Sequence, residues 1–323
     1  MPELPEVETV VRGLSRHIIG QKIRDIKILN KKSFYGTSRS ASWQTSKSKI
    51  LNLKRRGKGI IINLSKGLSL LIHLKMTGQL IYVPGSPMLE RSASGSRMTK
   101  GGRHSRTGDF QLLRASSSER NPDRLNLGHP TKDFGEKMPS SHTRVIFELS
   151  YGTLYFNDQR KFGWVKLVPT CDIEKDSFIK RLGVEPFSKS FTVDILWQTI
   201  QKHPNGPIKS TLMDQSLIAG VGNIYSDEAL FVAGIRPDRK GKTITIAENK
   251  KLISAIKKVL ELGIKHSGTS IANYKNAEGL PGKMQNYLKV YGRTGQPCPH
   301  KCGIVKVIRI GGRSAHFCPV CQK

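Results

Sequence analysis

The N-terminal residues Met1, Pro2 and Glu3 combine groups that can carry out covalent chemistry. Removal of Met1 ahead of a small residue would leave Pro2 with a free secondary amine. An α-amino group titrates near pH ~8, roughly two units below a lysine, so a useful fraction is neutral and nucleophilic. Its condensation with a sugar C1′ would give a cationic iminium ion, and Glu3 stands beside it to donate or accept a proton. Taken alone the motif is weak, because most Pro2 residues are ordinary N-terminal residues.

Four of the five cysteines form two close pairs near the C-terminus. Two tight knuckles supply the soft ligands that tetrahedral zinc requires, and this local clustering argues against an extracellular disulfide framework. We therefore expect one structural Zn²⁺ ion, with two disulfides as the alternative and a histidine ligand (His300 or His316) as a less favoured variant. The four candidate ligands are Cys298, Cys302, Cys318 and Cys321.

The chain is strongly basic, with a formal net charge of +30 over 323 residues and a pI near 10.2. Such an excess suits a polyanionic partner, with nucleic acid as the first candidate and an anionic membrane surface as the second. No stretch reaches the ~18 consecutive apolar residues of a spanning helix, and the N-terminus lacks a secretory signal pattern. We expect a soluble, intracellular protein.

Several basic segments have the composition of phosphate contacts. The 157–163 loop puts cations next to an aromatic ring, which is how a protein both neutralises phosphate and wedges a base stack. Met76, in the 73–78 turn, offers a second apolar wedge. Arg313 lies in a glycine-loosened tip between the cysteine pairs, where a guanidinium could grip a phosphate. The basic run 54–58 is, by composition alone, typical of a solvated face.

Hydrophobic periodicity predicts which elements hold these residues. An amphipathic helix begins near Val7 and closes at Gly20, followed by strand-like runs and, from Ser177, a helical period. Asn223 is placed to cap the helix that follows it. Segment 84–141 is rich in Ser, Gly, Pro and Arg, and we expect it to be a largely disordered insertion. The expected strands are 22–29, 59–64, 69–74, 79–83, 145–149 and 153–157, and the clearest helices 212–218, 224–232 and 248–262.

Taken in order, these motifs resemble the formamidopyrimidine-DNA glycosylase family. The opening 1–9 and segments 55–58, 73–78, 157–163, 208–228 and 290–293 match it together with the four-cysteine module. The resemblance implies an α+β multidomain protein: an N-terminal β-sandwich with a leading helix (1–170), a helix–two-turn–helix domain (177–285) and a zinc-finger β-hairpin (289–323). It also implies excision of oxidised purines from double-stranded DNA, chiefly 8-oxoguanine and formamidopyrimidines, followed by cleavage of the abasic strand.

The resemblance also implies residue roles. Pro2 would be the Schiff-base nucleophile and Glu3 the proton donor, with Lys58 assigned to β-elimination and Arg313 to the lesion phosphate and δ-elimination. Glu6 and Glu228 correspond to supporting carboxylates near the nucleophile. The residues implied to fill the space of the flipped base are Met76, Arg160 and Phe162, and those implied to contact phosphates are His142, Lys209 and Asn223.

Three departures from the family pattern stand out: a Cys-x3-Cys first knuckle, Asn205 near a usually basic position, and the 84–141 insertion. Two rival functions stay open at this point, an endonuclease VIII-like glycosylase for oxidised pyrimidines and a catalytically inactive damage-binding protein. The residues that follow Pro2 and Glu3, Leu4 to Glu8, favour the formamidopyrimidine branch. We expect a bacterial, cytoplasmic, nucleoid-associated monomer.

Overall fold

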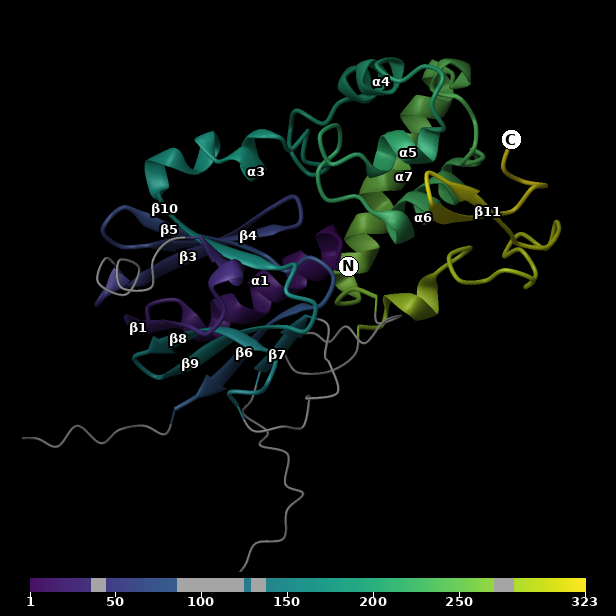
Figure 1. Cartoon of the computed structure of the whole chain (residues 1–323). Helices are drawn as coiled ribbons and strands as arrows, with labels where there is room; N and C mark the ends of the chain where they lie inside the picture. The colour runs from purple at the N-terminus through teal and green to yellow at the C-terminus, as the bar shows by residue number, and fades with distance from the viewer. Residues whose placement is uncertain (36–44, 86–124, 129–137, 270–281) are drawn as a thin grey trace, which may run out of the picture.

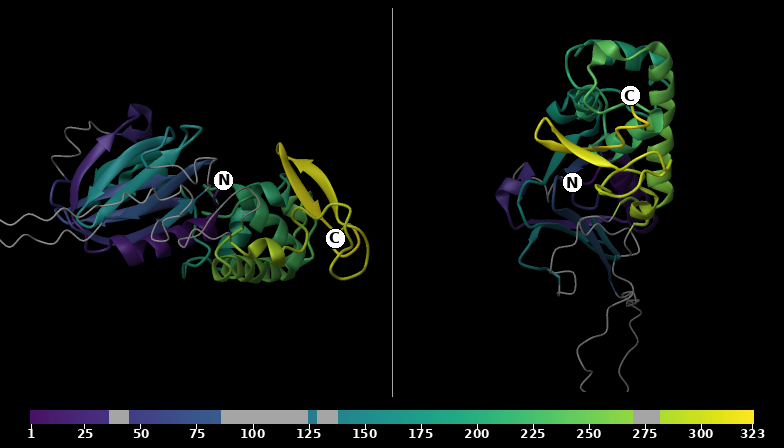
Figure 2. Two further views of the ribbon diagram at one scale, coloured as in Figure 1. Left: turned by 90° about the horizontal axis from the view of Figure 1, so that it is seen from below. Right: turned by 90° about the vertical axis from the view of Figure 1, so that its right-hand side faces the viewer.

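The computed structural model describes residues 1–35, 45–85, 125–128, 138–269 and 282–323. A β lobe and a helical lobe lie side by side, with the N-terminus between them and the C-terminal hairpin against the helical lobe (Figures 1 and 2). No helix in these described ranges is both long and apolar enough to cross a membrane.

Helix α1 (Leu4–Ile18) runs through the β lobe and buries its apolar face, including Val7, Val10 and Leu14. Pro5 lies in its first turn, where a missing N–H costs nothing. The Glu3 N–H donates to Glu6 Oε2 (2.9 Å), which satisfies an otherwise unpaired backbone donor at the helix start. The predicted helix and its end before Gly20 are confirmed.

Two five-stranded sheets form the β-sandwich, in the orders β1-β8-β9-β6-β7 and β2-β10-β5-β4-β3. Neighbouring strands are antiparallel except β2 and β10. Apolar residues of both sheets and of α1 share one core. The strands are β1 (Ile23–Ile28), β2 (Phe34–Tyr35), β3 (Ile50–Arg56), β4 (Gly59–Leu64), β5 (Leu68–His73), β6 (Gly78–Pro84), β7 (Leu125–Gly128), β8 (Thr143–Leu149), β9 (Gly152–Asp158) and β10 (Trp164–Pro169).

The sheet differs from the sequence-based expectation in two places. Strand β3 was not expected, because its second half is the basic run read as a solvated face; its pairing with β4 places that run at a turn. Strand β7 lies inside the segment expected to lack regular structure and pairs with β6, so that expectation was wrong for these four residues. Residues 86–124 and 129–137 of the insertion lie outside the described residues.

The helical lobe packs around α7, which is amphipathic and begins with a reciprocal cap between Thr245 and Glu248. Helix α5 starts four residues earlier than expected and ends at Met213, because Asp214 begins a turn whose carboxylate accepts from Ser216 N. The helices are α3 (Ser177–Lys180), α4 (Val193–Gln201), α5 (Ile208–Met213), α6 (Asn223–Ala233) and α7 (Ile246–Lys265), with short 3-10 turns η1 (Lys31–Ser33), η3 (Thr170–Lys175), η4 (Gly241–Thr243) and η5 (Met284–Tyr287).

The C-terminal hairpin consists of β11 (Lys306–Ile310) and β12 (Arg313–Phe317), as the cysteine spacing predicted. Its base shares a small core with Phe231 of α6 and with Val290. The tip residues Gly311 and Gly312 both have positive φ (55° and 76°), which only glycine adopts without strain, and they turn the chain directly into Arg313.

Candidate active site

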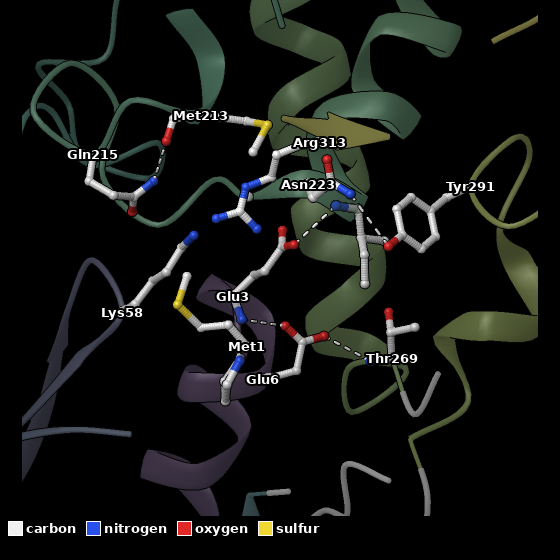
Figure 3. Close-up of a pocket in the computed structure, with 13 residues that line it drawn as sticks. Met1, Glu3, Glu6, Lys58, Met213, Gln215, Asn223, Thr269, Tyr291 and Arg313 are labelled. Atoms are coloured by element: carbon white, nitrogen blue, oxygen red, sulfur yellow. Dashed lines mark hydrogen bonds between the residues drawn. The ribbon is translucent and has the colours of Figure 1, made fainter. Parts of the chain in front are cut away.

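A cavity of about 310 Å³ opens where the two lobes meet. The chain start, the β3–β4 turn, the start of α6 and the first residue of β12 each contribute a polar side chain to it. Glu3, Lys58 and Arg313, which are far apart in sequence, point toward one another in this space (Figure 3). Pro2, Glu6 and Asn223 also line it, so six of the residues singled out from the sequence share one pocket.

The Glu3 carboxylate lies at the N-terminus of α6. Its oxygens accept from Ile224 N (3.0 Å) and Tyr225 N (3.4 Å), where the helix dipole favours a negative charge. Gly222 makes this approach possible, since a Cβ there would lie 2.3 Å from Glu3 Cδ. Asn223 was expected to cap this helix; that prediction was wrong, because Gly222 is the capping position and Glu3 provides the acceptor.

The amino terminus and Glu6 are buried close to Glu3. Burial lowers the pKa of the Met1 α-amino group, although the carboxylates of Glu3 and Glu6 oppose this shift. Burial likewise raises the pKa of Glu6, followed by the effect of the Glu3 charge. Glu6 accepts from Tyr225 Oη and Thr269 N, both at 2.8 Å, so it ties the chain start to α6 and to the loop that follows α7.

Lys58 projects from the β3–β4 turn into the cavity and is only 5% exposed. Gly57 before it has a positive φ of 56°, which gives the turn the direction that sends Lys58 inward. Burial lowers the pKa of Lys58, with Glu3 and Glu6 opposing. A buried lysine of this kind can act as a proton acceptor. The basic run is therefore not simply a solvated face, since it ends in a buried pocket lysine.

Arg313 is exposed at the rim of the cavity, and Asn223 lies behind it. Asn223 Nδ2 lies 3.4 Å from the Tyr291 hydroxyl and 3.5 Å from Ser314 Oγ. Its Oδ1 is buried without a hydrogen-bond partner among the described residues. Both side chains line the cavity, and Arg313 has no ion-pair partner in the described part of the chain.

Met76, Arg160 and Phe162 form one exposed group at the edge of the β lobe. The Arg160 guanidinium lies 4.9 Å from the centre of the Phe162 ring, and Arg160 Nη1 is 3.3 Å from Met76 Sδ. The Met76 and Phe162 side chains are 42% and 55% exposed. Asp158 holds the loop beneath them, accepting from Gly163 N (2.6 Å) and Arg160 N (3.2 Å).

The structure places the remaining expected residues differently. His142 is partly buried, and its phosphate contact stays a prediction. Lys209 is completely buried: its Nζ donates to Asp227 Oδ1 (2.6 Å) and to the Ser314 carbonyl (2.5 Å), so it exposes no charge in the DNA-free structure, and its phosphate contact stays a prediction. Burying this charge is tolerable only because it is paired.

Glu228 does not line the cavity near the nucleophile. Burial raises its pKa, while its oxygens accept from the backbone N–H groups of Lys289, Val290 and Tyr291 at 2.8–2.9 Å. It therefore supports the pocket indirectly, by holding Tyr291, which does line it.

Residues that line or support the pocket were missed in the sequence, among them Gln215 and Tyr291, which line it, and Tyr225, which donates to Glu6. Tyr225 begins a run of seven consecutive buried residues in α6, Tyr225 to Phe231, which includes Asp227 and Glu228. Burying acidic side chains without hydrogen-bond partners is costly, so acidic residues inside such a run need polar neighbours. This feature could have indicated that α6 lies between the two lobes. Gln215 and Tyr291 lie in turns that carry no periodic signal.

The four C-terminal cysteines fit a zinc ion. All four Sγ atoms lie within 4.8 Å of one another, with neighbouring separations of 3.5, 3.6 and 3.7 Å. Zn–S bonds of about 2.3 Å in a tetrahedron give S–S edges of about 3.8 Å. His316 Nδ1 instead lies 3.0 Å from Asp227 Oδ2, and His300 stacks on Phe231. The cluster is a closed four-thiolate structural site.

Comparison with known proteins agrees with this geometry. Three family models match the chain in order: the formamidopyrimidine-DNA glycosylase N-terminal domain (1–165), the H2TH domain of the same enzymes (182–275), and the zinc finger found in FPG and IleRS (295–323). The fold and site thus define a DNA glycosylase.

The chain belongs to the formamidopyrimidine-DNA glycosylase family. It is 38% identical over 327 residues to the formamidopyrimidine-DNA glycosylase of Pelotomaculum thermopropionicum, covering 100% of this chain and 99% of that one. It is 37% identical over 331 residues to that of Desulfitobacterium hafniense, covering both completely. A Lactococcus lactis Fpg mutant bound to Fapy-dG-containing DNA matches with a TM-score of 0.77 at 29% identity, covering 100% of each chain, and an Fpg complex with abasic-site DNA with 0.76, covering 99% of each.

Proposed function

We propose that this enzyme removes oxidised purines, 8-oxoguanine and formamidopyrimidines, from duplex DNA and then cleaves the strand at the abasic site. The observation that carries the proposal is the pocket itself. A chain start with a lowered amino pKa lies beside Glu3, Glu6, Lys58 and Arg313. Relatives bound to Fapy-dG and abasic-site DNA support this substrate class.

Access to the glycosidic bond requires that the damaged nucleotide leave the helix, at a cost of a few kcal/mol. Met76, Arg160 and Phe162 form an exposed apolar and cationic group that would fill the vacated space and recover part of the stacking energy. Arg313, Asn223 and His142 would hold phosphates of the bent strand. Each of these three side chains reaches the protein surface or the cavity.

The proposed chemistry begins once Met1 has been removed and the Pro2 amine is free. The amine attacks C1′, the bond to the damaged base breaks, and Glu3 donates a proton to the sugar as its ring opens to an iminium ion. The iminium acidifies the C2′ proton. Lys58, whose pKa is lowered by burial, accepts that proton in its neutral form while the C3′–O bond to phosphate breaks. A second elimination, assisted by Arg313, would break the C5′–O bond to the other phosphate, and hydrolysis of the iminium by water would then free the sugar from Pro2.

We also propose the division 1–170, 177–285 and 289–323 for the three domains, each of which contains one matched family model. We further propose that the enzyme works as a monomer. The bacterial relatives support a cytoplasmic enzyme that works on nucleoid DNA.

The decisive experiment is incubation with an 8-oxoguanine:cytosine duplex in borohydride, which reduces an iminium to a stable cross-link, followed by mass mapping of the cross-linked peptide. We expect the adduct at Pro2. Adduct formation at a lysine would overturn the nucleophile, and no adduct with binding retained would favour the damage-binding alternative. A parallel reaction with a duplex that carries an oxidised pyrimidine tests the endonuclease VIII-like alternative. That alternative predicts faster excision of the oxidised pyrimidine than of 8-oxoguanine.

A further inference from the structure

The β3–β4 turn that carries Lys58 forms several hydrogen bonds with a segment of the helical lobe. Glu185 lies between α3 and α4, and its carboxylate accepts from Arg55 Nη1 (2.8 Å), from Arg56 Nη1 (3.2 Å) and, by a very short bond, from Gly57 N. The Glu185 side chain is 16% exposed and that of Arg55 only 9%. One carboxylate thus fixes three consecutive residues, the last of which precedes Lys58.

The same segment, residues 182–185, supports the turn in two further ways. Arg56 Nη2 donates to the carbonyls of Leu182 (3.0 Å) and Gly183 (2.9 Å). Gly57 packs on Leu182, since a Cβ at Gly57 would lie 3.1 Å from Leu182 Cδ1. We call residues 182–185 the strap.

On its other side the strap is tied to the wall of the pocket opposite Lys58. Gly183 N donates to the Gln215 carbonyl (2.8 Å), and Ala219 N donates to the Val184 carbonyl (2.9 Å). Gln215 itself lines the cavity, as Figure 3 shows. The strap therefore connects Lys58 on the β lobe to the loop before α6 on the helical lobe.

Loss of Glu185 would affect the contacts of this turn unequally. Arg55 would retain Glu8 (3.1 Å) and the Gly57 carbonyl (3.0 Å), and Arg56 would retain its two carbonyls. The Gly57 N–H, which belongs to the Arg56–Gly57 peptide group, would lose the Glu185 carboxylate it donates to. The hairpin would stay attached, while this peptide group loses its hydrogen bond and becomes free to rotate, which changes the backbone at Gly57 from which Lys58 projects.

We propose that Glu185 is a positioning residue that fixes Lys58 in the pocket and so sets the rate of strand cleavage, but not that of base removal. This inference rests on the proposed role of Lys58 as the base in β-elimination. Base removal depends on Pro2 and Glu3, which are held by α1 and α6 and do not touch the strap.

The test compares two single-turnover reactions of the full-length enzyme: base excision from an 8-oxoguanine duplex, and β-elimination on a preformed abasic duplex. The variants are Glu185→Ala and Glu185→Gln, with Lys58→Ala as the reference for a lost base. Glu148→Gln is the matched control, because Glu148 forms an exposed ion pair with Lys27 on the outer strands β1 and β8.

We expect Glu185→Ala to slow elimination about ten- to hundredfold, the loss typical of a misplaced catalytic group, and to leave excision within about twofold. Glu185→Gln keeps an acceptor for Gly57 N and should recover most of the elimination rate. A Glu185→Ala variant that eliminates normally, in an enzyme that Lys58→Ala disables, would overturn the inference alone. Normal elimination by Lys58→Ala would instead overturn the proposed role of Lys58.

The pH profile of elimination separates positioning from general destabilisation. Burial lowers the pKa of Lys58, and a loosened turn would admit water, so the profile of Glu185→Ala should shift to higher pH. The charged and titratable groups that face Lys58 are Glu3, Glu6, Arg313, His73 and the amino terminus, and all are unchanged in the variant. A reduced rate with an unshifted profile would mean that Glu185 only supports the fold.

Discussion

The cavity and the exposed group beside it are built on opposite principles. In the cavity, Glu3, Glu6 and Lys58 are each at most 5% exposed, and backbone or hydroxyl donors hold the two carboxylates. In the exposed group, Met76 and Phe162 are about half exposed, and Arg160 has no ion-pair partner among the described residues. The cavity is organised before DNA arrives, whereas the exposed group acquires its partners only in the complex.

The difference follows from what each region has to do. Groups that move protons must be held in place and kept from water, because a charge in a dry, fixed site interacts far more strongly than one in solvent. Groups that replace a flipped base must be free to enter the helix. The comparison predicts that substitutions around the cavity cost chemistry or stability, while those in the exposed group cost only DNA affinity.

The largest effect should come from the chain start. An N-terminal extension that prevents removal of Met1 leaves no free Pro2 amine, so borohydride trapping and base excision should fall below detection. DNA affinity should stay nearly unchanged, because the exposed group and Arg313 are untouched. The control is the same extension removed by a protease that regenerates Pro2. Trapping by the extended protein would show that a different amine reacts.

Loss of the zinc site should be the next largest effect. Cys318→Ser opens a closed four-thiolate site, so metal is lost and the hairpin that presents Arg313 loses its support. We expect loss of specific DNA binding and of one equivalent of zinc by elemental analysis. Cys171→Ser, at an exposed cysteine outside the cluster, is the control and should change neither. Full activity in metal-free protein would contradict a structural role.

Lys209→Ala should destabilise the protein by about 3–5 kcal/mol, because it leaves the Asp227 carboxylate buried without its cation. A Lys209→Met, Asp227→Asn double variant, which removes both charges, should be less destabilised than the two single variants together. The salt dependence of DNA binding should not change if Lys209 stays buried in the complex. Chemical denaturation and a salt titration measure the two quantities. A shallower salt dependence would confirm Lys209 as a phosphate contact.

The contrast between Lys209 and the cysteines shows what the sequence could predict. The cysteine spacing, the α1 periodicity and the β8–β9 hairpin depend on residues close in the chain, and all three were predicted correctly. The Glu3 cap of α6 joins residues more than 200 positions apart, and no local pattern carries it. Lys209 sits in a short helix whose burial depends on a hairpin 100 residues later. The positive charge of a lysine in the sequence could not distinguish a residue that binds phosphate from one that is buried in an ion pair.

A smaller effect should appear at His73, a buried neighbour of Lys58. Burial lowers its pKa to about 3 from the ordinary 6.5, so the unfolded chain binds a proton more readily than the folded one. This difference has no effect on stability above pH 6.5, where both states are neutral, and it destabilises the folded state increasingly as the pH falls toward 3, by about 2 kcal/mol at pH 5. His73→Asn keeps an acceptor for Lys75 N and does not titrate. Its free energy of unfolding should therefore fall less between pH 7 and pH 5 than that of the parent protein, and an equal fall would contradict the burial effect.

The smallest effect should be at Arg160, because its guanidinium forms no ion pair in the described part of the DNA-free protein. Each phosphate that a protein neutralises contributes about −0.9 to the slope of log affinity against log salt concentration. Arg160→Ala should therefore make this slope shallower by about one, with the free energy of unfolding unchanged, since the guanidinium is exposed and rests only on Phe162 and Met76. Lys27→Ala, which removes a cation from an exposed pair on β1, is the matched control and should leave the slope as it is. An unchanged slope in Arg160→Ala would place this guanidinium away from the backbone. A loss of stability instead would break the comparison itself, because it would mean that the exposed group is also organised before DNA binds.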